Sequence, residues 1–437
     1  MTTQPLRLLR ADSHDVPAEL ARLRQPLAFD PIASQSSQQA RTVRAIIRQV
    51  ARRQDHALIE LTERFDGVRL EPHQLRVSPD ELATAACQLP PELLAAIDLA
   101  IRNVRRFQQH ILMHQPLPLQ ADGVSLHSRL QPLRRVGICV PAAAAPLPST
   151  AIMTAVPAQV AGVGQIALVA PPRHNRTIHP TILATAHRLG ITEVYRLGGA
   201  QAVAALALGT QTIPRVDKIA GPGGIYTQLA KKFLFGQVDI DSLAGPTEIL
   251  IIADQTARPA FLAADMLAQL EHDPGLAILL VTNTALADAV QHELANLLNR
   301  LPRAQAIRRC LQNYAAIVLA DLDQAITIAN HFAPEHLHIQ TEDPSRLAER
   351  IDAAGAIFLG HYCPEAAGDY IAGPSHVLPT GGTARSFSGL TCNDFLRQTS
   401  ILCYDQQALR QAANAVVTLA NAEQLTAHAL SVQIRCP

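Results

Sequence analysis

Apolar residues follow two different periods along the chain, and the period changes close to Val136. Up to about Leu119 they recur at helical spacing, most clearly over residues 38–65 and 90–112. From Val136 onward, short continuous apolar runs alternate with further helical segments. These runs predict strands at residues 136–140, 164–170, 193–198, 216–221, 248–254, 276–282, 315–321 and 355–360. Continuous apolar strands separated by helices indicate parallel sheets that are covered on both faces.

This alternation occurs in two successive runs, which predicts an α/β fold with two doubly wound, incomplete Rossmann-like parallel-sheet domains. A chain of 437 residues is also too long for one hydrophobic core. We expect a helical N-terminal segment (1–35), a discontinuous first α/β domain (36–137 and 245–389), a second α/β domain (138–244) and a helical C-terminal tail (390–437). The tail loses the strand pattern and is too short to fold alone, so we expect it to pack on a partner subunit.

The composition limits the partners of the chain. Hydrophobic residues make up 48% and charged residues 17%, and 37 Lys and Arg balance 37 Asp and Glu. This balance, without a long basic run, gives no indication of a nucleic acid or an acidic membrane as a partner. The most apolar long stretch, 151–170, is broken by proline, glycine and glutamine, and the first residues lack the apolar core of a signal peptide. The seven cysteines form no CxxC pair, which is typical of reduced thiols in the cytoplasm.

Glycine-rich loops raise the question of a nucleotide. Gly162, Gly164 and Ala167 formally match G-x-G-x-x-A, but they precede a predicted strand and therefore cannot present their amides at a helix N-terminus. The loops at 140–150, 197–203 and 220–227 do leave strands and lead toward helices. Their backbone N–H groups are suited to a phosphate or a polar cofactor edge. Tight turns between strands and helices explain the same residues equally simply.

A predicted helix in the second run carries a polar stripe. Within residues 261–274, Asp265, Gln269 and His272 fall on one face of the helix, beside an apolar face. Pro274 ends this helix, which places Gln269 and His272 in its last turn. A solvated helix face is one interpretation of the stripe, and half of a metal site is the other.

Three further pairs of an acid and a histidine stand apart from this α/β pattern. The pairs are Glu335 with His336, Asp369 with His376, and Glu423 with His428. Taken singly, a histidine is more often a surface or core residue than a ligand. Together with Gln269 and His272, these residues offer the imidazole, carboxylate and further oxygen donors that zinc binds. Glu335 and His336 are then left to move protons near neutral pH.

These motifs carry a family resemblance that covers nearly the whole chain. The blocks Q-x-x-H-D-P, A-P-E-H-L and G-P-S-H-V-L-P-T occur in the order and spacing of histidinol dehydrogenases, which the sequence resembles. The resemblance implies a zinc enzyme that oxidises L-histidinol to L-histidine through L-histidinaldehyde. Two NAD⁺ are consumed in these last two steps of histidine biosynthesis.

Matched position by position, the resemblance also implies residue roles. One zinc ion per subunit is held by Gln269, His272, Asp369 and His428. His336 acts as base on the substrate hydroxyl, and Glu335 activates the water that adds to the aldehyde. The residues implied to bind substrate are Thr247, Gln269, His272, His336, Asp369, His376, Glu423 and His428. The family is homodimeric with sites completed by both subunits, which explains a C-terminal helix without a partner in its own chain.

Departures from the family pattern concern the cofactor. Cys139 stands where typical members have Tyr, Ala142 and Ala143 stand where they have Gly-Gly, and Gly224 stands where they have Asn. Gln201 is retained, so the implied cofactor-binding residues are Gln201, Cys139 and Gly224. Replacing glycine by alanine denies close backbone approach and disfavours positive φ. The NAD⁺ loop is therefore expected to follow a different path.

Three hypotheses fit these residues. The first is a working histidinol dehydrogenase with an altered cofactor pocket. The second is a paralogue on the same scaffold that oxidises another small polar alcohol. The third is a zinc-retaining protein, hydrolase-like or non-enzymatic, that has lost hydride transfer.

Overall fold

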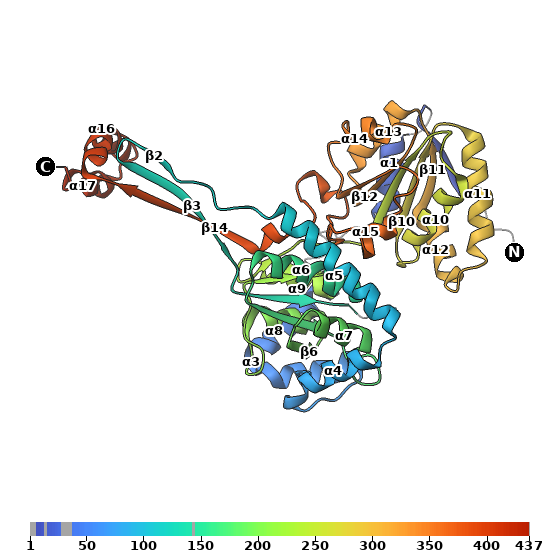
Figure 1. The fold of residues 1–437 in the computed structure, drawn as a ribbon, viewed down its shortest axis with the longest axis horizontal. Coiled ribbons are helices and arrows are strands. Elements are labelled where there is room, and N and C mark those ends of the chain that lie inside the picture. Colours follow the sequence, from blue (N-terminus) through green and yellow to red (C-terminus); the bar gives the residue numbers. More distant parts are fainter. Residues whose placement is uncertain (1–5, 13–14, 28–36, 142–144, 437) are drawn as a thin grey trace.

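The computed structural model describes residues 6–12, 15–27, 37–141 and 145–436 of the chain. Two α/β lobes lie side by side, and a long arm extends from one of them to the C-terminus (Figure 1). Ala142 and Ala143, which were expected to alter the NAD⁺ loop, lie outside the described residues. None of the helices in the described part of the chain combines the length and apolarity that a membrane span needs.

The lobes are called larger and smaller after the sizes of their sheets. The larger lobe is built on a six-stranded sheet in the order β1-β11-β10-β9-β12-β13, and all of its neighbouring strands are parallel. The strands are β1 (Arg7–Arg10), β9 (Glu248–Ala253), β10 (Leu276–Val281), β11 (Ala315–Leu319), β12 (His336–Gln340) and β13 (Ala356–Leu359). Alternate apolar residues of β9, β10 and β11 enter two separate cores, one on each face. Burial on both faces is the physical reason for the continuous apolar runs in these strands.

Helices cover both faces of this sheet. One face packs on α10 (Pro259–Leu270), α11 (Thr284–Leu298) and α12 (Ala304–Tyr314). The other packs on α1 (Val16–Arg24), α13 (Leu322–Phe332) and α14 (Pro344–Ala348). The N-terminal segment thus contributes an edge strand and a helix to the larger lobe, although only a helix was expected there.

The smaller lobe contains a five-stranded parallel sheet in the order β6-β5-β4-β7-β8. Its strands are β4 (Arg135–Cys139), β5 (Gln165–Ala170), β6 (Glu193–Arg196), β7 (Lys218–Ala220) and β8 (Asp239–Ile240). One core contains residues of α3 (Gln38–Asp66), α8 (Gly199–Leu208) and α9 (Ile225–Leu234). The other core contains residues of α4 (Pro79–Gln88), α5 (Pro91–Ile111), α6 (Pro148–Ala161) and α7 (Pro180–Arg188). The fold class, two doubly wound parallel sheets, is confirmed.

The position of the early helices corrects one sequence-based expectation. Residues 36–137 were grouped with 245–389, but α3, α4 and α5 pack on the helices of the smaller lobe. The apolar stripes of these helices establish that they cover a core, and a stripe carries no information about which of two similar sheets it covers.

The arm combines a three-stranded antiparallel sheet, in the order β14-β3-β2, with two terminal helices. Its elements are β2 (Leu119–Ala121), β3 (Val124–Pro132), β14 (Leu396–Tyr404), α16 (Gln406–Ala422) and α17 (Thr426–Gln433). The expectation that the chain from 390 onward contains no strand is therefore wrong. Neither face of β14 is buried in this chain, so the strand lacks the alternation by which it would be recognised. The described residues also form the short 3₁₀ helices η1 (Pro72–Gln74), η2 (Thr383–Arg385) and η3 (Cys392–Phe395).

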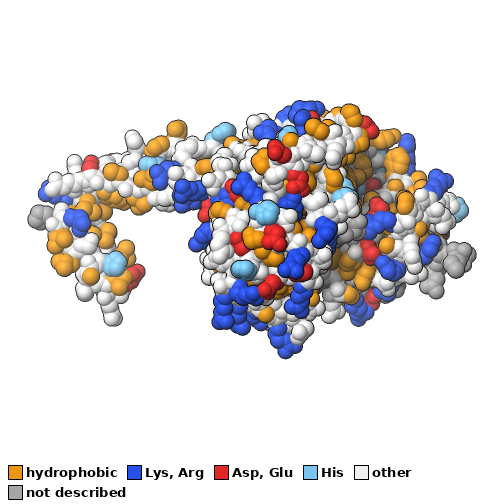
Figure 2. Space-filling model, turned by 90° about the horizontal axis from the view of Figure 1, so that it is seen from below, with side chains coloured by type: hydrophobic (Ala, Val, Ile, Leu, Met, Phe, Trp, Pro, Cys, Tyr) orange, Lys and Arg blue, Asp and Glu red, His pale blue; other side chains and the backbone are white. Residues whose placement is uncertain are grey.

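Apolar side chains are gathered on the arm. In Figure 2 hydrophobic atoms cluster on its terminal helices, away from the body of the molecule. Leu402, Leu419 and Ile434 are each about two-thirds exposed, at 66%, 66% and 65%. A set of large exposed apolar side chains of this kind marks a contact surface.

Candidate active site

Side chains from four segments meet at the amino ends of β9 and β12. Thr247 precedes β9, Glu335 precedes β12, and His336 is the first residue of β12. Gln269 comes from the last turn of α10, and α15 (Glu365–Tyr370) lies beside them. The segment after α15 reaches the smaller lobe, where Ser375 Oγ donates to the carbonyl oxygen of Met153, 2.9 Å away. The candidate site therefore lies on the side of the larger lobe that faces the smaller one.

A directed chain of hydrogen bonds links the predicted zinc ligand Gln269 to Glu335. Gln269 Nε2 donates to Thr247 Oγ1 over 2.7 Å, and Thr247 Oγ1 donates to Glu335 Oε2 over 2.7 Å. Glu335 Oε2 also accepts the backbone N–H of Glu248 over 2.9 Å. Gln269 is fully buried, and its Oε1 has no hydrogen-bond partner among the residues that the structure describes. The chain thus fixes the amide so that its oxygen, the atom that can bind a metal, is free.

His336 is held in one tautomer by its neighbours. Its Nδ1 lies 3.2 Å from the carbonyl oxygen of Glu248, which can only accept, so we assign the hydrogen to Nδ1. Nδ1 also lies 3.3 Å from Glu365 Oε1 and 3.7 Å from Glu335 Oε2. Nε2 is buried and has no hydrogen-bond partner in the described part of the chain. Burial lowers the pKa of His336 to about 3, so the ring is neutral near pH 7.

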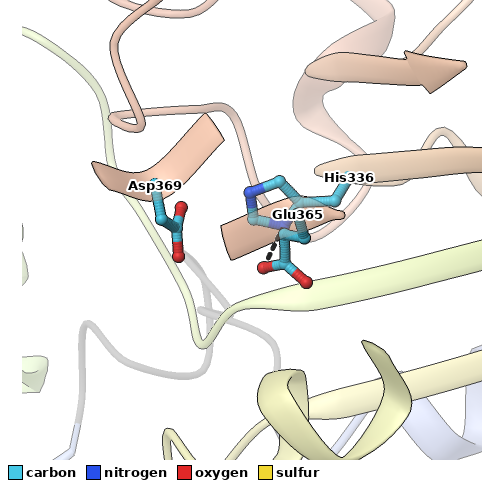
Figure 3. A group of neighbouring side chains, drawn as sticks. All are labelled: His336, Glu365 and Asp369. Carbon is cyan, nitrogen blue, oxygen red and sulfur yellow. Dashed lines mark ion pairs between the residues drawn. The ribbon is translucent and has the colours of Figure 1, made fainter. Parts of the chain in front are cut away.

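Sequence reasoning missed Glu365. Glu365 and Asp369 lie four residues apart on α15 and therefore on the same side of the helix, next to the His336 ring (Figure 3). Ligand atoms of His336, Glu365 and Asp369 lie within 4.8 Å of one another. Burial raises the pKa of Glu365 well above its ordinary value, and Asp369 and Glu335 add to the effect. The signal available in the sequence was its spacing from Asp369, one helical turn away.

Two of the predicted histidines also lie near Asp369. His376 Nδ1 is 3.1 Å from the Asp369 carbonyl oxygen, and burial lowers the pKa of His376 to about 4. Desolvation lowers the pKa of the His272 ring, and the Asp369 carboxylate opposes that change. His272 follows α10, which ends at Leu270, so the expectation of His272 in the last turn is wrong. A proline disfavours helical geometry in the residue before it, which here is Asp273. The helix therefore ends ahead of Asp273.

The two predicted residues of the C-terminal helices do not join this group. His428 lies on α17 and Glu423 is the C-cap of α16, both exposed at the far end of the arm (Figure 1). Within the described residues of a single chain, the arrangement brings Gln269, His272 and Asp369 to one region and leaves His428 distant. A complete set of the predicted zinc ligands therefore needs a second chain.

A cavity lies in the smaller lobe, at the ends of β4, β5 and β7. It measures about 240 Å³, and its lining includes Cys139, Gly198, Gly199, Gly223 and Gly224 of the glycine-rich loops together with the larger side chains of Arg173 and Tyr226. Gly224 has open space where a Cβ would stand. Gln201, by contrast, is buried and is not among the residues that line the cavity. Burial raises the pKa of Cys139 to about 11, so its thiol stays protonated at neutral pH.

The residues present suit a divalent metal. Gln269 Oε1, the ligand atom of a predicted zinc ligand, is buried and has no hydrogen-bond partner among the described residues. Buried polar atoms ordinarily have partners, so this oxygen points to a further group at the site. Oxygen and imidazole nitrogen donors are the ligands that zinc accepts. The glycine-lined cavity in the smaller lobe suits a cofactor whose polar edge approaches the backbone closely.

Comparisons with known proteins agree on one family. A family model described as histidinol dehydrogenase matches residues 32–436. A histidinol dehydrogenase of Rhodopirellula baltica is 49% identical over 394 residues, covering 90% of this chain and 86% of the relative. One of Thermosynechococcus vestitus is 48% identical over 405 residues, covering 92% and 94%. The crystal structure of histidinol dehydrogenase from Elizabethkingia anophelis aligns with a TM-score of 0.91 at 33% identity, covering 98% of both chains.

Proposed function

The chain belongs to the histidinol dehydrogenase family, and we propose on that premise how its own residues carry out the reaction. It is an oxidoreductase that converts L-histidinol to L-histidine through L-histidinaldehyde in histidine biosynthesis, and the family depends on zinc and NAD⁺.

His336 is the base that takes the proton of the substrate hydroxyl. Its Nδ1–H is donated to the carbonyl oxygen of Glu248, so its lone pair is on Nε2, which is buried and unpartnered. A neutral imidazole with a free lone pair accepts a proton as the alcohol is oxidised. The carboxyl groups of Glu365 and Glu335, beside Nδ1, stabilise the imidazolium that forms. The free Nε2 is the observation that carries the proposal.

Glu335 takes the proton of the water that adds to the aldehyde. Burial raises the pKa of Glu335 well above its ordinary value, and the Thr247 hydroxyl and the Glu248 N–H oppose this effect. A carboxyl group with a raised pKa both accepts and releases protons near neutral pH. Glu335 and His336 are adjacent in sequence, so one stretch of backbone serves both oxidation steps.

The cofactors have separate places. Zinc would be held by Gln269, His272 and Asp369 together with His428 of a second chain. The substrate would be bound by the same four residues and by Thr247, His336, His376 and Glu423. When bound, zinc supplies positive charge that holds the polar groups of the substrate in place. Cys139 and Gly224 would line the place of NAD⁺ in the smaller-lobe cavity, where the cofactor would supply the hydride acceptor. Gln201 would support the wall of this cavity through Gly199, because a Cβ added at Gly199 would lie 3.2 Å from Gln201 Oε1.

The active form is a homodimer in which each arm completes the site of the other chain. Two observations support this proposal: His428 lies far from the other predicted ligands, and the arm exposes large apolar side chains. A cytoplasmic location is also part of the proposal. It is supported by seven free cysteines, because thiols of this number stay reduced in that compartment.

One assay tests the function directly. The purified protein with L-histidinol and NAD⁺ should form two NADH for each histidine, and removal of zinc by a chelator should abolish turnover. Turnover of another small alcohol, but not of histidinol, would instead support the paralogue. Failure to bind NAD⁺ at all would support a protein that has lost hydride transfer.

A further inference from the structure

A buried ion pair lies directly behind the acid–base residues. Arg24, the last residue of α1, binds Glu248 through two parallel hydrogen bonds, Nε to Oε2 and Nη2 to Oε1, each 2.9 Å long. The side chains are only 13% and 3% exposed. Gly381 N–H donates to Glu248 Oε1 over 3.1 Å. A two-bond arginine–carboxylate pair fixes orientation as well as distance.

Arg24 also binds the segment that leads to Glu335. Its Nη1 donates to the carbonyl oxygen of Phe332 over 2.8 Å, and its guanidinium lies 3.4 Å from the centre of the Phe332 ring. Phe332 ends α13, and only Ala333 and Pro334 separate it from Glu335. One guanidinium therefore joins the start of β9 to the backbone that carries the acid–base residues.

Glu248 contacts both acid–base residues through its backbone alone. Its N–H donates to Glu335 Oε2 over 2.9 Å, and its carbonyl oxygen lies 3.2 Å from His336 Nδ1. The second contact is the one that leaves the lone pair of His336 on Nε2. The orientation of one peptide unit thus sets both the direction of the carboxyl group and the tautomer of the imidazole.

We propose that Arg24 is a positioning residue for the reaction: by holding the Glu248 side chain and the Phe332 carbonyl together, it orients the Glu248 backbone that aligns Glu335 and His336. The role of Arg24 in turnover rests on the proposed function, whereas its effect on the His336 tautomer does not. Among the described residues Arg24 forms no hydrogen bond with Gln269 or Asp369, and Gln269 is linked to Glu335 only through Thr247, so the loss of Arg24 should lower zinc affinity less than it lowers kcat.

A purely structural role makes a different prediction. Removing Arg24 alone leaves a buried, uncompensated carboxylate, which destabilises the fold. Replacing both partners by apolar residues removes that penalty. If the pair only supports the fold, the double variant should therefore recover stability and activity together. If the pair positions the acid–base residues, stability should return without activity.

The experiment compares Arg24→Met, Arg24→Lys and the double variant Arg24→Met with Glu248→Met in the full-length protein. We expect the kcat of histidinol oxidation, measured at saturating zinc, to fall about tenfold to a hundredfold in Arg24→Met, with the KM for histidinol unchanged. Arg24→Lys keeps the charge but cannot form the two parallel bonds, so its kcat should fall between wild type and Arg24→Met. The double variant should regain thermal stability and keep the low kcat.

A matched control and a second readout separate this inference from the proposed function. Arg350→Met removes an exposed pair with Asp323 on the same lobe and should leave kcat unchanged. The ¹⁵N chemical shifts of the His336 ring, identified by comparison with His336→Gln, should report hydrogen on Nδ1 in wild type and a mixture of tautomers in Arg24→Met. Wild-type kcat in Arg24→Met, recovery of kcat in the double variant, or an unchanged tautomer would overturn the proposal. If the wild-type protein does not oxidise histidinol, but the tautomer of the His336 ring still changes in Arg24→Met, only the proposed function is refuted.

Discussion

Gln269 Nε2 donates to Thr247 Oγ1 over 2.7 Å, and this contact determines which end of the amide is free. An amide without such a partner can turn its nitrogen toward the site, where it would repel a cation. The hydroxyl of Thr247 is itself fixed, because it donates to Glu335. The orientation of a predicted metal ligand is therefore coupled to the proton-transferring carboxyl group through one threonine.

Thr247→Val tests this coupling, since valine keeps the shape of threonine and lacks the hydroxyl. We expect zinc affinity to fall about tenfold to a hundredfold, the range usual for groups that orient a metal ligand. Competition with a chelator measures the change. Thr327→Val, which removes an exposed hydroxyl that donates to the Asp323 carbonyl within its own helix α13, is the control. Equal zinc affinity in wild type and Thr247→Val would show that the amide needs no orientation.

His336→Ala and Glu335→Ala should separate the two oxidation steps. Loss of the His336 base should slow oxidation of histidinol by about a hundredfold to ten-thousandfold. Loss of Glu335 should mainly slow oxidation of histidinaldehyde, which can be supplied directly in stopped-flow measurements. His292→Ala, at an exposed position on α11, controls for removal of an imidazole. If both variants lose both steps equally, the division of roles between the two residues is wrong.

Complementation tests whether the arm completes the site of a second chain. His336→Ala and His428→Ala should each be inactive alone. When the two variants are expressed together, each mixed dimer should contain one intact site, formed by the core of one chain and the arm of the other. NADH formation by the mixture should therefore exceed that of either variant. No recovery, despite mixed dimers demonstrated by mass spectrometry, would mean that His428 serves its own chain.

The thiol of Cys139 should resist alkylation. Burial raises its pKa from 9.0 to about 11, so the thiol is protonated below that pH and becomes thiolate only as the pH rises through it. At neutral pH such a thiol holds about a hundredth of the thiolate of an ordinary cysteine. Mass spectrometry after brief iodoacetamide treatment should find the exposed Cys87 and Cys403 modified and Cys139 not. Labelling of Cys139 should still be rising at pH 9.5; a plateau below pH 9 would contradict the raised pKa.

The linear sequence determined the two parallel sheets and most of the candidate site. Strands such as 276–281 are buried on both faces, and a strand in that environment has to be apolar at every position. The acid and histidine positions could also be recognised from the sequence, because few residue types can transfer protons or bind a metal.

Only the tertiary structure decided which elements meet. The apolar stripes of α3 to α5 could be buried against either sheet. β14 has no buried face and therefore shows no alternation of apolar and polar residues. Glu365 and Arg24 carry no motif of their own; their importance comes from lying beside His336 and Glu248. The sequence likewise could not predict that His428 lies far from Gln269. Periodicity indicates which residues of a segment are buried and contains no information about long-range partners. The physical reason is the same in each case. A local pattern indicates whether a residue is buried or exposed, whereas the packing of the folded chain determines which residues it contacts.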